Sequence, residues 1–219
     1  MVTLHPLYPR YPGNFIMFGT GQLLTASDIT NTNTQAIYGV WDKPANSTVF
    51  SRSNLQVQTL SLVTPATSGL SQNILTVTNN NINWASSAGW YLDLITGGQR
   101  EITDPQLING AYIATLVTPP ANVCNTPYSS MLLAINYKTG GALSSPQIDI
   151  NADRTVNSSD KHNGKNPVGV GLAPDYVSNA NMLQSGNNLI VQMITQTGQE
   201  LGVINISNSP RQSSWWQIK

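Results

Sequence analysis

Oxygen-bearing side chains recur at alternate positions in one stretch of the chain, residues 149–160. The stretch reads Asp-Ile-Asn-Ala-Asp-Arg-Thr-Val-Asn-Ser-Ser-Asp, which matches positions 1, 3, 5, 9 and 12 of a twelve-residue calcium loop of the EF-hand type. Calcium takes six to eight oxygen ligands at about 2.3–2.6 Å, and a chain curling around an ion turns every second residue inward. The sequence therefore predicts a Ca²⁺ site. Its predicted ligands are Asp149, Asn151, Asp153, Thr155 through its backbone carbonyl, Asn157 and Asp160.

Two residues of this loop depart from the calcium motif. Arg154 stands where the motif has glycine, and Asp160 stands where it has a glutamate that grips the ion with both oxygens. A guanidinium near the ion repels it unless it swings out, and the shorter last carboxylate makes a grip with both oxygens less assured. With two acidic ligands, or three if Asp160 joins, we expect a dissociation constant of about 10⁻⁴–10⁻³ M, the range of extracellular calcium modules. The alternative is a surface turn without an ion, because Asp and Asn favour turns in any case.

Composition excludes several classes of partner. Only 9% of the 219 residues are charged and the formal net charge is zero, against about 25% charged residues in an average soluble domain. We therefore expect neither nucleic-acid binding nor electrostatic attachment to anionic lipid. No apolar run reaches 18 residues, so the sequence predicts no transmembrane helix. The N-terminus lacks the apolar segment of a signal peptide, which leaves an internal protein or the C-terminal portion of a longer, exported one.

Short apolar runs separated by turn residues predict an all-β fold. The expected strands are residues 15–18, 35–42, 55–63, 74–77, 89–95, 106–108, 111–117, 130–135, 189–194 and 201–206. Asn109-Gly110 predicts a type I′ hairpin turn. Residues 26–34 read as a loop or one helical turn, and residues 163–181 read as a Gly- and Pro-rich loop.

A strand followed by Thr-Gly occurs three times, with the threonines at residues 96, 139 and 197. The first interval is roughly 40–45 residues, the size of a four-stranded propeller blade, and the second is longer by about the length of the calcium loop and its flanks. The pattern predicts a β-propeller over residues 1–219, an incomplete ring of about four blades, with residues 149–160 as an inserted calcium-binding loop.

An ordered set of motifs resembles the C-terminal β-propeller of the PilC/PilY family of type IV pilus tip and biogenesis proteins. The matching segments are residues 18–24, 34–42, 89–94 with Gly98 and Arg100, 103–105, Cys124, 139–141, the 149–160 loop and residues 214–215. The set runs in the family's order across nearly the whole chain. Two residues of the loop depart from the family's pattern: Asn157 stands where the family usually has Asp, and Arg154 stands where it usually has Gly.

This resemblance implies a non-enzymatic, calcium-binding protein that supports type IV pilus assembly, retraction control, twitching motility and adhesion. It implies export to the cell surface, at the pilus tip or associated with the outer membrane. The implied partners are minor pilins of the tip complex and, through an N-terminal region absent from this chain, a host surface.

Two other functions remain open on the residues alone. Quinone-dependent dehydrogenases share propeller blades with Thr-Gly repeats, but no serine-hydrolase, zinc-protease or nucleotide-binding motif is found, and a carboxylate pair such as Asp93 and Glu101 is indistinguishable from surface charges. We assign no catalytic or organic-cofactor-binding residue. The other alternative is a generic extracellular binding or scaffold propeller. Trp41 and Trp90 are expected in the core rather than as sugar-stacking platforms. Cys124 is expected to be a free or partly buried thiol and not a nucleophile.

Overall fold

The computed structural model describes residues 3–5, 13–43, 51–64, 72–120, 128–151, 153, 155–172, 177–185 and 188–195. The elements of the first half are β1 (Thr3–His5), β2 (Asn14–Gly19), α1 (Ala26–Ile29), β3 (Ala36–Asp42), the 3₁₀ turn η1 (Arg52–Asn54), β4 (Gln56–Val63), β5 (Ile74–Val77), β6 (Gly89–Asp93) and β7 (Arg100–Glu101). Those of the second half are β8 (Gln106–Ile108), β9 (Ala111–Thr118), β10 (Ser129–Asn136), the 3₁₀ turn η2 (Ser158–Asp160), β11 (Gly169–Gly171), β12 (Val177–Ser185) and β13 (Asn188–Thr195).

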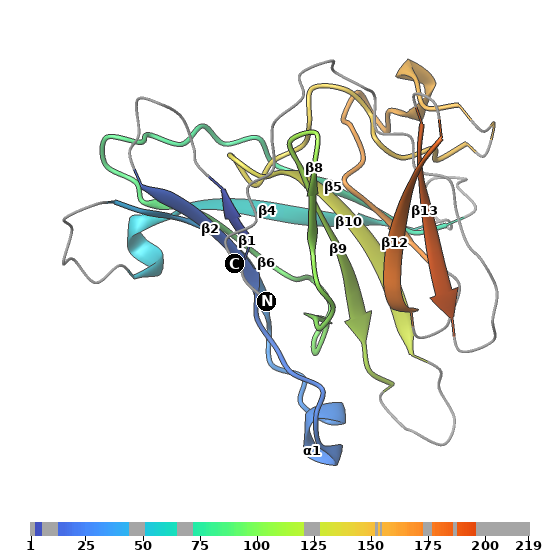
Figure 1. Ribbon diagram of the computed structural model, residues 1–219, viewed down its shortest axis with the longest axis horizontal. Coiled ribbons are helices and arrows are strands. Elements are labelled where there is room, and N and C mark those ends of the chain that lie inside the picture. Colours follow the sequence, from blue (N-terminus) through green and yellow to red (C-terminus); the bar gives the residue numbers. More distant parts are fainter. Residues whose placement is uncertain are drawn as a thin grey trace.

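Eleven of these strands form one strongly curled sheet (Figure 1). Its order is β1-β2-β3-β6-β4-β5-β11-β10-β9-β7, with β8 also paired to β9, and β12 and β13 form a separate two-stranded sheet. All neighbours are antiparallel except β4 and β6, which run parallel. Because β4 pairs with β6 on one side and with β5 on the other, it joins the two halves of the sheet.

The predicted all-β class is confirmed, and most expected strands lie where the alternation of apolar residues placed them. The hairpin between β8 and β9 turns at Asn109 and Gly110, which both have positive φ, as a type I′ turn requires. Thr-Gly turns follow β6 and β10, while the third, at residues 197–198, and the strand expected at 201–206 lie outside the described residues. The curled sheet is propeller-like in outline, but within the described residues β4 prevents a division into separate four-stranded blades, so the ring of about four blades stays a prediction.

The loop expected at residues 163–181 was wrong in part, because it contains β11 and the start of β12. β11 is a Gly-Val-Gly segment that is held between β10 and β5 by long-range pairing. The start of β12 reads Val-Ser-Asn-Ala-Asn, with few of the residues that strands prefer. Strand β7 was also missed, since two charged residues, Arg100 and Glu101, give no strand signal.

The hydrophobic core is built from strands in both halves of the curled sheet and includes both tryptophans expected there, Trp41 and Trp90. Trp90 is fully buried, and its indole N–H donates to the carbonyl of Tyr137 at 2.9 Å. A Cβ added to Gly39 would stand 2.4 Å from the Trp90 ring, and one added to Gly140 would stand 2.5 Å from it. The Thr-Gly turn after β10 therefore packs directly on the tryptophan of β6, which joins the two halves of the core.

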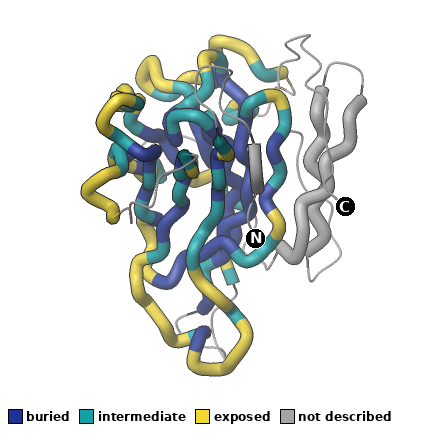
Figure 2. Tube along the Cα trace, turned by 60° about the vertical axis from the view of Figure 1, so that its left-hand side comes forward, coloured by how far each residue is buried: buried dark blue, intermediate teal, exposed yellow. Residues whose placement is uncertain are grey.

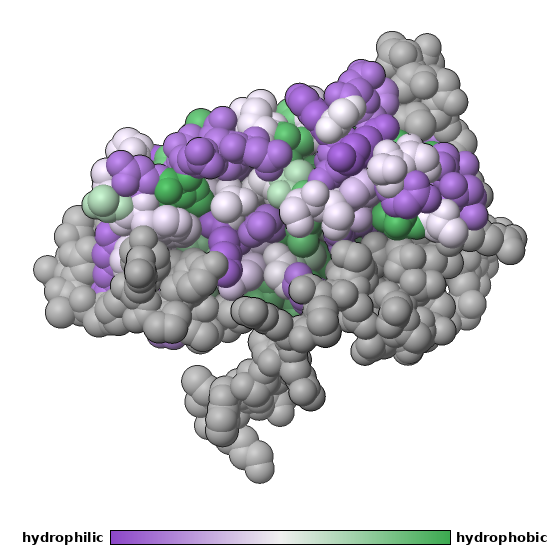
Figure 3. Space-filling model, turned by 90° about the horizontal axis from the view of Figure 1, so that it is seen from above, coloured by the Kyte–Doolittle hydropathy of each residue, from purple (hydrophilic) through white to green (hydrophobic). Residues whose placement is uncertain are grey.

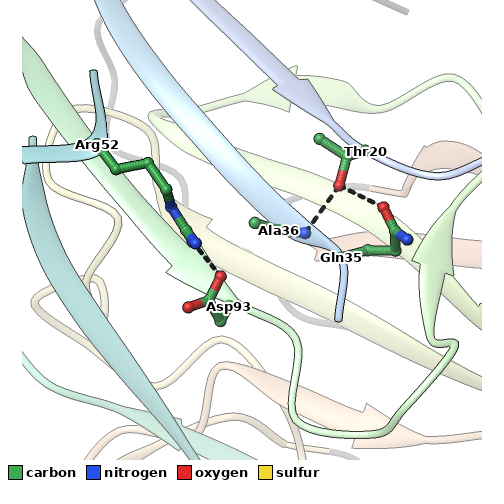
Figure 4. Close-up of polar contacts among 5 residues, drawn as sticks. All are labelled: Thr20, Gln35, Ala36, Arg52 and Asp93. Carbon is green, nitrogen blue, oxygen red and sulfur yellow. Dashed lines mark hydrogen bonds and ion pairs between the residues drawn. The ribbon is translucent and has the colours of Figure 1, made fainter. Parts of the chain in front are cut away.

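One connection extends away from this body. Residues 20–35, which join β2 to β3 and include α1, form a long arm at the bottom of Figure 1, and most of the arm is exposed in Figure 2. We refer to these residues as the 20–35 protrusion. At its base the Thr20 hydroxyl donates to Gln35 Oε1 at 2.8 Å and accepts from the Ala36 N–H at 2.9 Å (Figure 4).

Candidate calcium loop

The predicted calcium loop connects β10 to β11 and ends in the short helix η2, near the top of Figure 1. Residues 152 and 154 of the loop, and with them the predicted unfavourable Arg154, lie outside the described residues. Seen from above, the described surface of the molecule is mostly hydrophilic, with small apolar patches (Figure 3). Within the loop, residues 151, 153, 155 and 157–159 are exposed to solvent, whereas Asp160 is buried.

Side chains at odd positions of the loop fold back onto the backbone two residues further on. Asp149 Oδ1 accepts from the N–H of Asn151 at 3.2 Å, Asn151 Oδ1 from the N–H of Asp153 at 3.0 Å, and Asp153 Oδ1 from the N–H of Thr155 at 2.8 Å. Asn157 Oδ1 repeats the pattern with the N–H of Ser159 at 2.8 Å. These successive Asx turns curl the chain in one direction, which explains why Asp and Asn occupy alternate positions.

The same side chains also contact one another. The Asn151 amide donates to Asp153 Oδ2 at 3.1 Å and to the Ser159 hydroxyl at 2.9 Å. The Asn157 amide donates to the Thr155 hydroxyl at 3.1 Å, and that hydroxyl donates to Asp153 Oδ1 at 2.6 Å. Predicted ligands from both ends of the loop are thus connected by one hydrogen-bond network.

Asp160 has a different position from the other five predicted ligands. Its side chain is fully buried, and its two carboxylate oxygens accept the N–H of Ile150 at 3.0 Å and the N–H of Asn157 at 2.8 Å. It therefore ties the beginning of the loop to its end. A buried carboxylate with two charge-assisted bonds stabilises the closed loop, so the sequence identified the residue but not this structural role.

The donor set of the loop is suited to a hard cation. Among the described residues, no group of three or more His, Cys, Asp or Glu side chains could hold a metal. A site here would therefore depend on the carboxylates of Asp149 and Asp153, the amide oxygens of Asn151 and Asn157, and a backbone carbonyl at Thr155, all of them oxygen ligands. Hydrogen bonds from the hydroxyl and N–H of Thr155 lower the pKa of Asp153, which keeps that carboxylate ionised and able to bind a cation. The loop fits calcium, and calcium binding stays a prediction.

The carboxylate pair considered for an enzyme does not form a joint site. Asp93 makes an ion pair with Arg52 at the surface (Figure 4). Glu101 is instead buried and accepts the Tyr112 hydroxyl at 2.7 Å. Burial raises the pKa of Glu101 to about 7 and also raises that of Tyr112. Each carboxylate has its own partner, and Cys124 lies outside the described residues.

Sequence reasoning missed Arg100, whose fully buried guanidinium reaches into the 20–35 protrusion. It appeared only as one residue of a family motif, without a role. The available signal was its position directly after Gly97-Gly98-Gln99, since an arginine next to a glycine turn can approach backbone closely. Nothing local identifies the segment it contacts, because that segment lies about 70 residues earlier in the chain.

Within the described part of the chain, no helix is long and apolar enough to cross a membrane.

Comparison with known proteins supports the resemblance seen in the sequence, although no family model matches the chain. The chain is 28% identical over 203 residues to a type IV pilus biogenesis factor PilY1 homolog of Xylella fastidiosa, a match that covers 88% of this chain and 16% of the relative. A second Xylella fastidiosa protein of the same name is 29% identical over 136 residues, covering 59% of this chain and 9% of that protein. The chain thus spans about a sixth or less of the length of these curated relatives.

The fold resembles the crystal structure of the Pseudomonas aeruginosa PilY1 C-terminal domain. The TM-score is 0.71 at 23% sequence identity, and the match covers 92% of this chain and 43% of that one. The predicted resemblance to the PilC/PilY family is confirmed by these PilY1 matches.

Proposed function

We propose that this chain is a propeller-like C-terminal part of a type IV pilus biogenesis protein, and that its 149–160 loop binds Ca²⁺. The similarity to two PilY1 homologs supports the pilus role. The observation that carries the calcium role is the run of Asx turns that presents oxygens from residues 149 to 157. A bound cation would supply electrostatic stabilisation of this loop, not a catalytic step.

The loop's residues suit a binding equilibrium with extracellular calcium. Two carboxylates and two amides give a low ligand charge, which corresponds to the millimolar range of extracellular modules, about 10⁻⁴–10⁻³ M. The Asx turns and the Asp160 closure order the backbone in advance, so less conformational entropy is lost on binding. Calcium at a free concentration c would then stabilise the folded chain by mass action, by RT ln(1 + c/Kd), which grows only logarithmically once c exceeds the dissociation constant.

The direct test is calorimetric titration of the purified chain with CaCl₂. We expect saturable binding of one ion per chain, abolished in the Asp149→Ala/Asp153→Ala double variant. The matched control is Asp42→Ala/Asp104→Ala, which removes two exposed carboxylates outside the loop and leaves the same net charge change. Absence of binding up to several millimolar CaCl₂, or equal loss in the control, would refute the calcium proposal.

The pilus role is tested separately in cells that make the full-length protein. We expect the protein at the cell surface, co-purifying with minor pilins of the pilus tip, and we expect its deletion to reduce surface pili, twitching motility and adhesion. Cells carrying the calcium-loop double variant should assemble or retain fewer pili than cells with the control variant. Normal piliation and motility after deletion would contradict the pilus role whatever the outcome of the calcium titration.

A further inference from the structure

The two ends of the curled sheet meet at one short strand. β7 is the last strand in the order of the sheet and β2 is the second, yet the two are in direct contact. A Cβ added to Gly19, the last residue of β2, would stand 2.5 Å from the Cβ of Glu101, and one added to Gly21 would stand 2.5 Å from the Cβ of Arg100. So close an approach requires glycine at both positions. We refer to this contact of Arg100 and Glu101 with residues 19–21 as the seam.

Arg100 connects the seam to the 20–35 protrusion, the arm at the bottom of Figure 1. Its side chain is 1% exposed. Nη1 donates to the carbonyls of Gln22 at 2.6 Å and Asp28 at 2.8 Å, Nη2 donates to that of Asn31 at 2.7 Å, and Nε donates to that of Gly98 at 2.7 Å. Three of these four carbonyls belong to the protrusion. Any movement of β7 away from the seam would therefore withdraw the donors that hold the protrusion in place.

Glu101 is the second side chain of the seam, and it is buried without a positive partner. It is 5% exposed, its Oε2 accepts the Tyr112 hydroxyl at 2.7 Å, and it also accepts the N–H of Gly19. In the described part of the chain, the titratable groups that face it from neighbouring segments are Tyr112 on β9 and Asp104 after β7, and neither is a cation. The adjacent guanidinium of Arg100 is bonded to the four carbonyls instead.

A buried carboxylate with two donors and no cation is less stable than the neutral acid in the same place. Burial accordingly raises the pKa of Glu101 to about 7, the Tyr112 hydroxyl and the Gly19 N–H lower it in part, and Asp104 raises it further. Water cannot reach the carboxyl group from the side of β2, because a Cβ added to Gly19 would stand 2.8 Å from both Cδ and Oε2. To be solvated, the carboxylate must move away from residues 19–21.

We propose that the seam is a pH-dependent closure of the curled sheet: it is closed while Glu101 is protonated, and it opens and releases the 20–35 protrusion when Glu101 ionises. β7 is able to move because it has only two residues and its ladder pairs them with Val117 and Leu116 of β9 alone. Arg100 moves with it, so one ionisation acts on the whole protrusion. The inference goes beyond the proposed calcium and pilus roles and depends on neither.

The direction of the effect follows from linkage. A carboxyl group whose pKa is raised in the closed seam favours closure at low pH, and the closed state loses stability as the pH rises from 4.5 through about 7. When the carboxyl group regains its ordinary pKa of 4.5 in the open state, the equilibrium constant for opening rises about 70-fold between pH 5 and pH 8.

Amide hydrogen exchange of the purified chain measures this opening, with a chelator present throughout so that calcium plays no part. Protection factors, which correct for the intrinsic effect of pH on exchange, should fall about 70-fold across residues 20–35 between pH 5 and pH 8. The fall should depend only weakly on urea, since opening of the seam exposes little surface. Protection that does not change with pH, or a fall with the full urea dependence of global unfolding, would overturn the proposal.

Two substitutions in the seam should change this pH response in opposite directions. Glu101→Gln keeps an acceptor for the Tyr112 hydroxyl but cannot ionise, so protection of the protrusion should be the same at pH 5 and pH 8. Tyr112→Phe removes a hydrogen bond that favours the ionised carboxylate, so the fall should exceed that of the parent chain. A purely structural role of either residue would change protection equally at both pH values. A fall of parental size in Glu101→Gln, or no larger fall in Tyr112→Phe, would refute control by Glu101.

Gly19→Ala tests the contact itself. The added methyl group collides with Glu101, so the seam cannot close and the protrusion should lose protection even at pH 5. Gly171→Ala on β11 is the control, because the nearest atoms to its added Cβ stand at 3.4 Å, an ordinary contact distance. Equal protection of residues 20–35 in Gly19→Ala and the parent chain at pH 5 would show that the protrusion does not depend on the seam.

Discussion

The 149–160 loop and the 20–35 protrusion are both long connections with little regular structure, and they are ordered in opposite ways. The loop is held by bonds between residues at most ten positions apart, such as Ile150 with Asp160. The protrusion depends on Arg100, which is 69 to 78 positions from the three carbonyls it binds there. A locally bonded loop can change with a ligand while the rest of the chain stays the same. A loop held by a core residue is coupled to the stability of the whole fold.

Removing the distant contact should have the largest effect. Arg100→Met leaves four buried or part-buried carbonyls without their donor, and at about 1 kcal/mol per bond the free energy of unfolding should fall by about 4 kcal/mol. Urea denaturation measures the loss, and amide exchange should rise across residues 20–35 but not across 149–160. The control is Arg52→Met, whose exposed ion pair with Asp93 should contribute about 1 kcal/mol or less. Unchanged exchange in the protrusion would contradict its dependence on Arg100.

Glu101, next to Arg100 on β7, should make the stability of the folded chain depend on pH. Its pKa is raised from 4.5 to about 7, so the folded protein holds the proton more tightly than the unfolded chain. The resulting stabilisation is complete below pH 4.5 and is lost as the pH rises through about 7, a decrease of about 3 kcal/mol. Denaturation at pH 5 and pH 8 should show this slope in the parent chain. The charged or titratable groups that act on Glu101 include Tyr112 and Asp104.

Glu101→Gln removes the titration and should flatten the slope between pH 5 and pH 8. The 149–160 loop should respond in the opposite direction and at more acidic pH. Hydrogen bonds lower the pKa of Asp153, so its contribution is present above its unfolded pKa and is lost as the pH falls below that range. A slope of the same size in Glu101→Gln would show that another group is responsible.

Breaking the local closure should have a smaller, confined effect. Asp160→Ala leaves the N–H groups of Ile150 and Asn157 without an acceptor, at a cost of about 2 kcal/mol. We expect faster amide exchange in the 149–160 loop and weaker calcium binding, with the protrusion unchanged. Asp160→Asn keeps an acceptor but loses the charge, so its free energy of unfolding should lie between those of the parent chain and Asp160→Ala. Faster exchange in both regions would mean that the loop is not independent of the sheet.

The smallest expected effect sharpens the calcium prediction. Asn157→Asp adds a third carboxylate to the oxygens at the odd positions, and we expect tighter calcium binding by up to about tenfold, or about 1.4 kcal/mol. Ser158→Asp adds the same charge at the neighbouring exposed position and is the control. Equal gains in the two variants would indicate general electrostatic attraction and not a ligand at position 157.

The difference between the two regions also explains what the sequence could predict. Asx turns form between residues two apart, so the alternation of Asp and Asn in 149–160 contains nearly all the information needed to recognise the loop. Strands with alternating apolar residues were also predicted correctly, because their pattern, too, repeats between residues two apart. Strand β11 and the contacts of Arg100 come from residues far apart in the chain, and no local pattern reports them. Asp160 was found for its oxygen and its position, whereas its closure of the loop through backbone N–H groups depends on the folded geometry.

The pairing of β5 with β11 has a consequence for the order in which the chain folds. Hairpins such as β2–β3, β8–β9 and β9–β10 join nearby segments, but Leu75 on β5 meets Gly169 on β11 across almost half of the chain. Contacts of such sequence separation require closure of a long loop before they contribute energy, which places them late on the pathway and slows folding. The 149–160 loop lies inside the connection that must be closed, between β10 and β11. If the proposed cation bound and ordered this loop, it would shorten the flexible part of the connection, and it would then raise the folding rate as well as stabilise the folded chain.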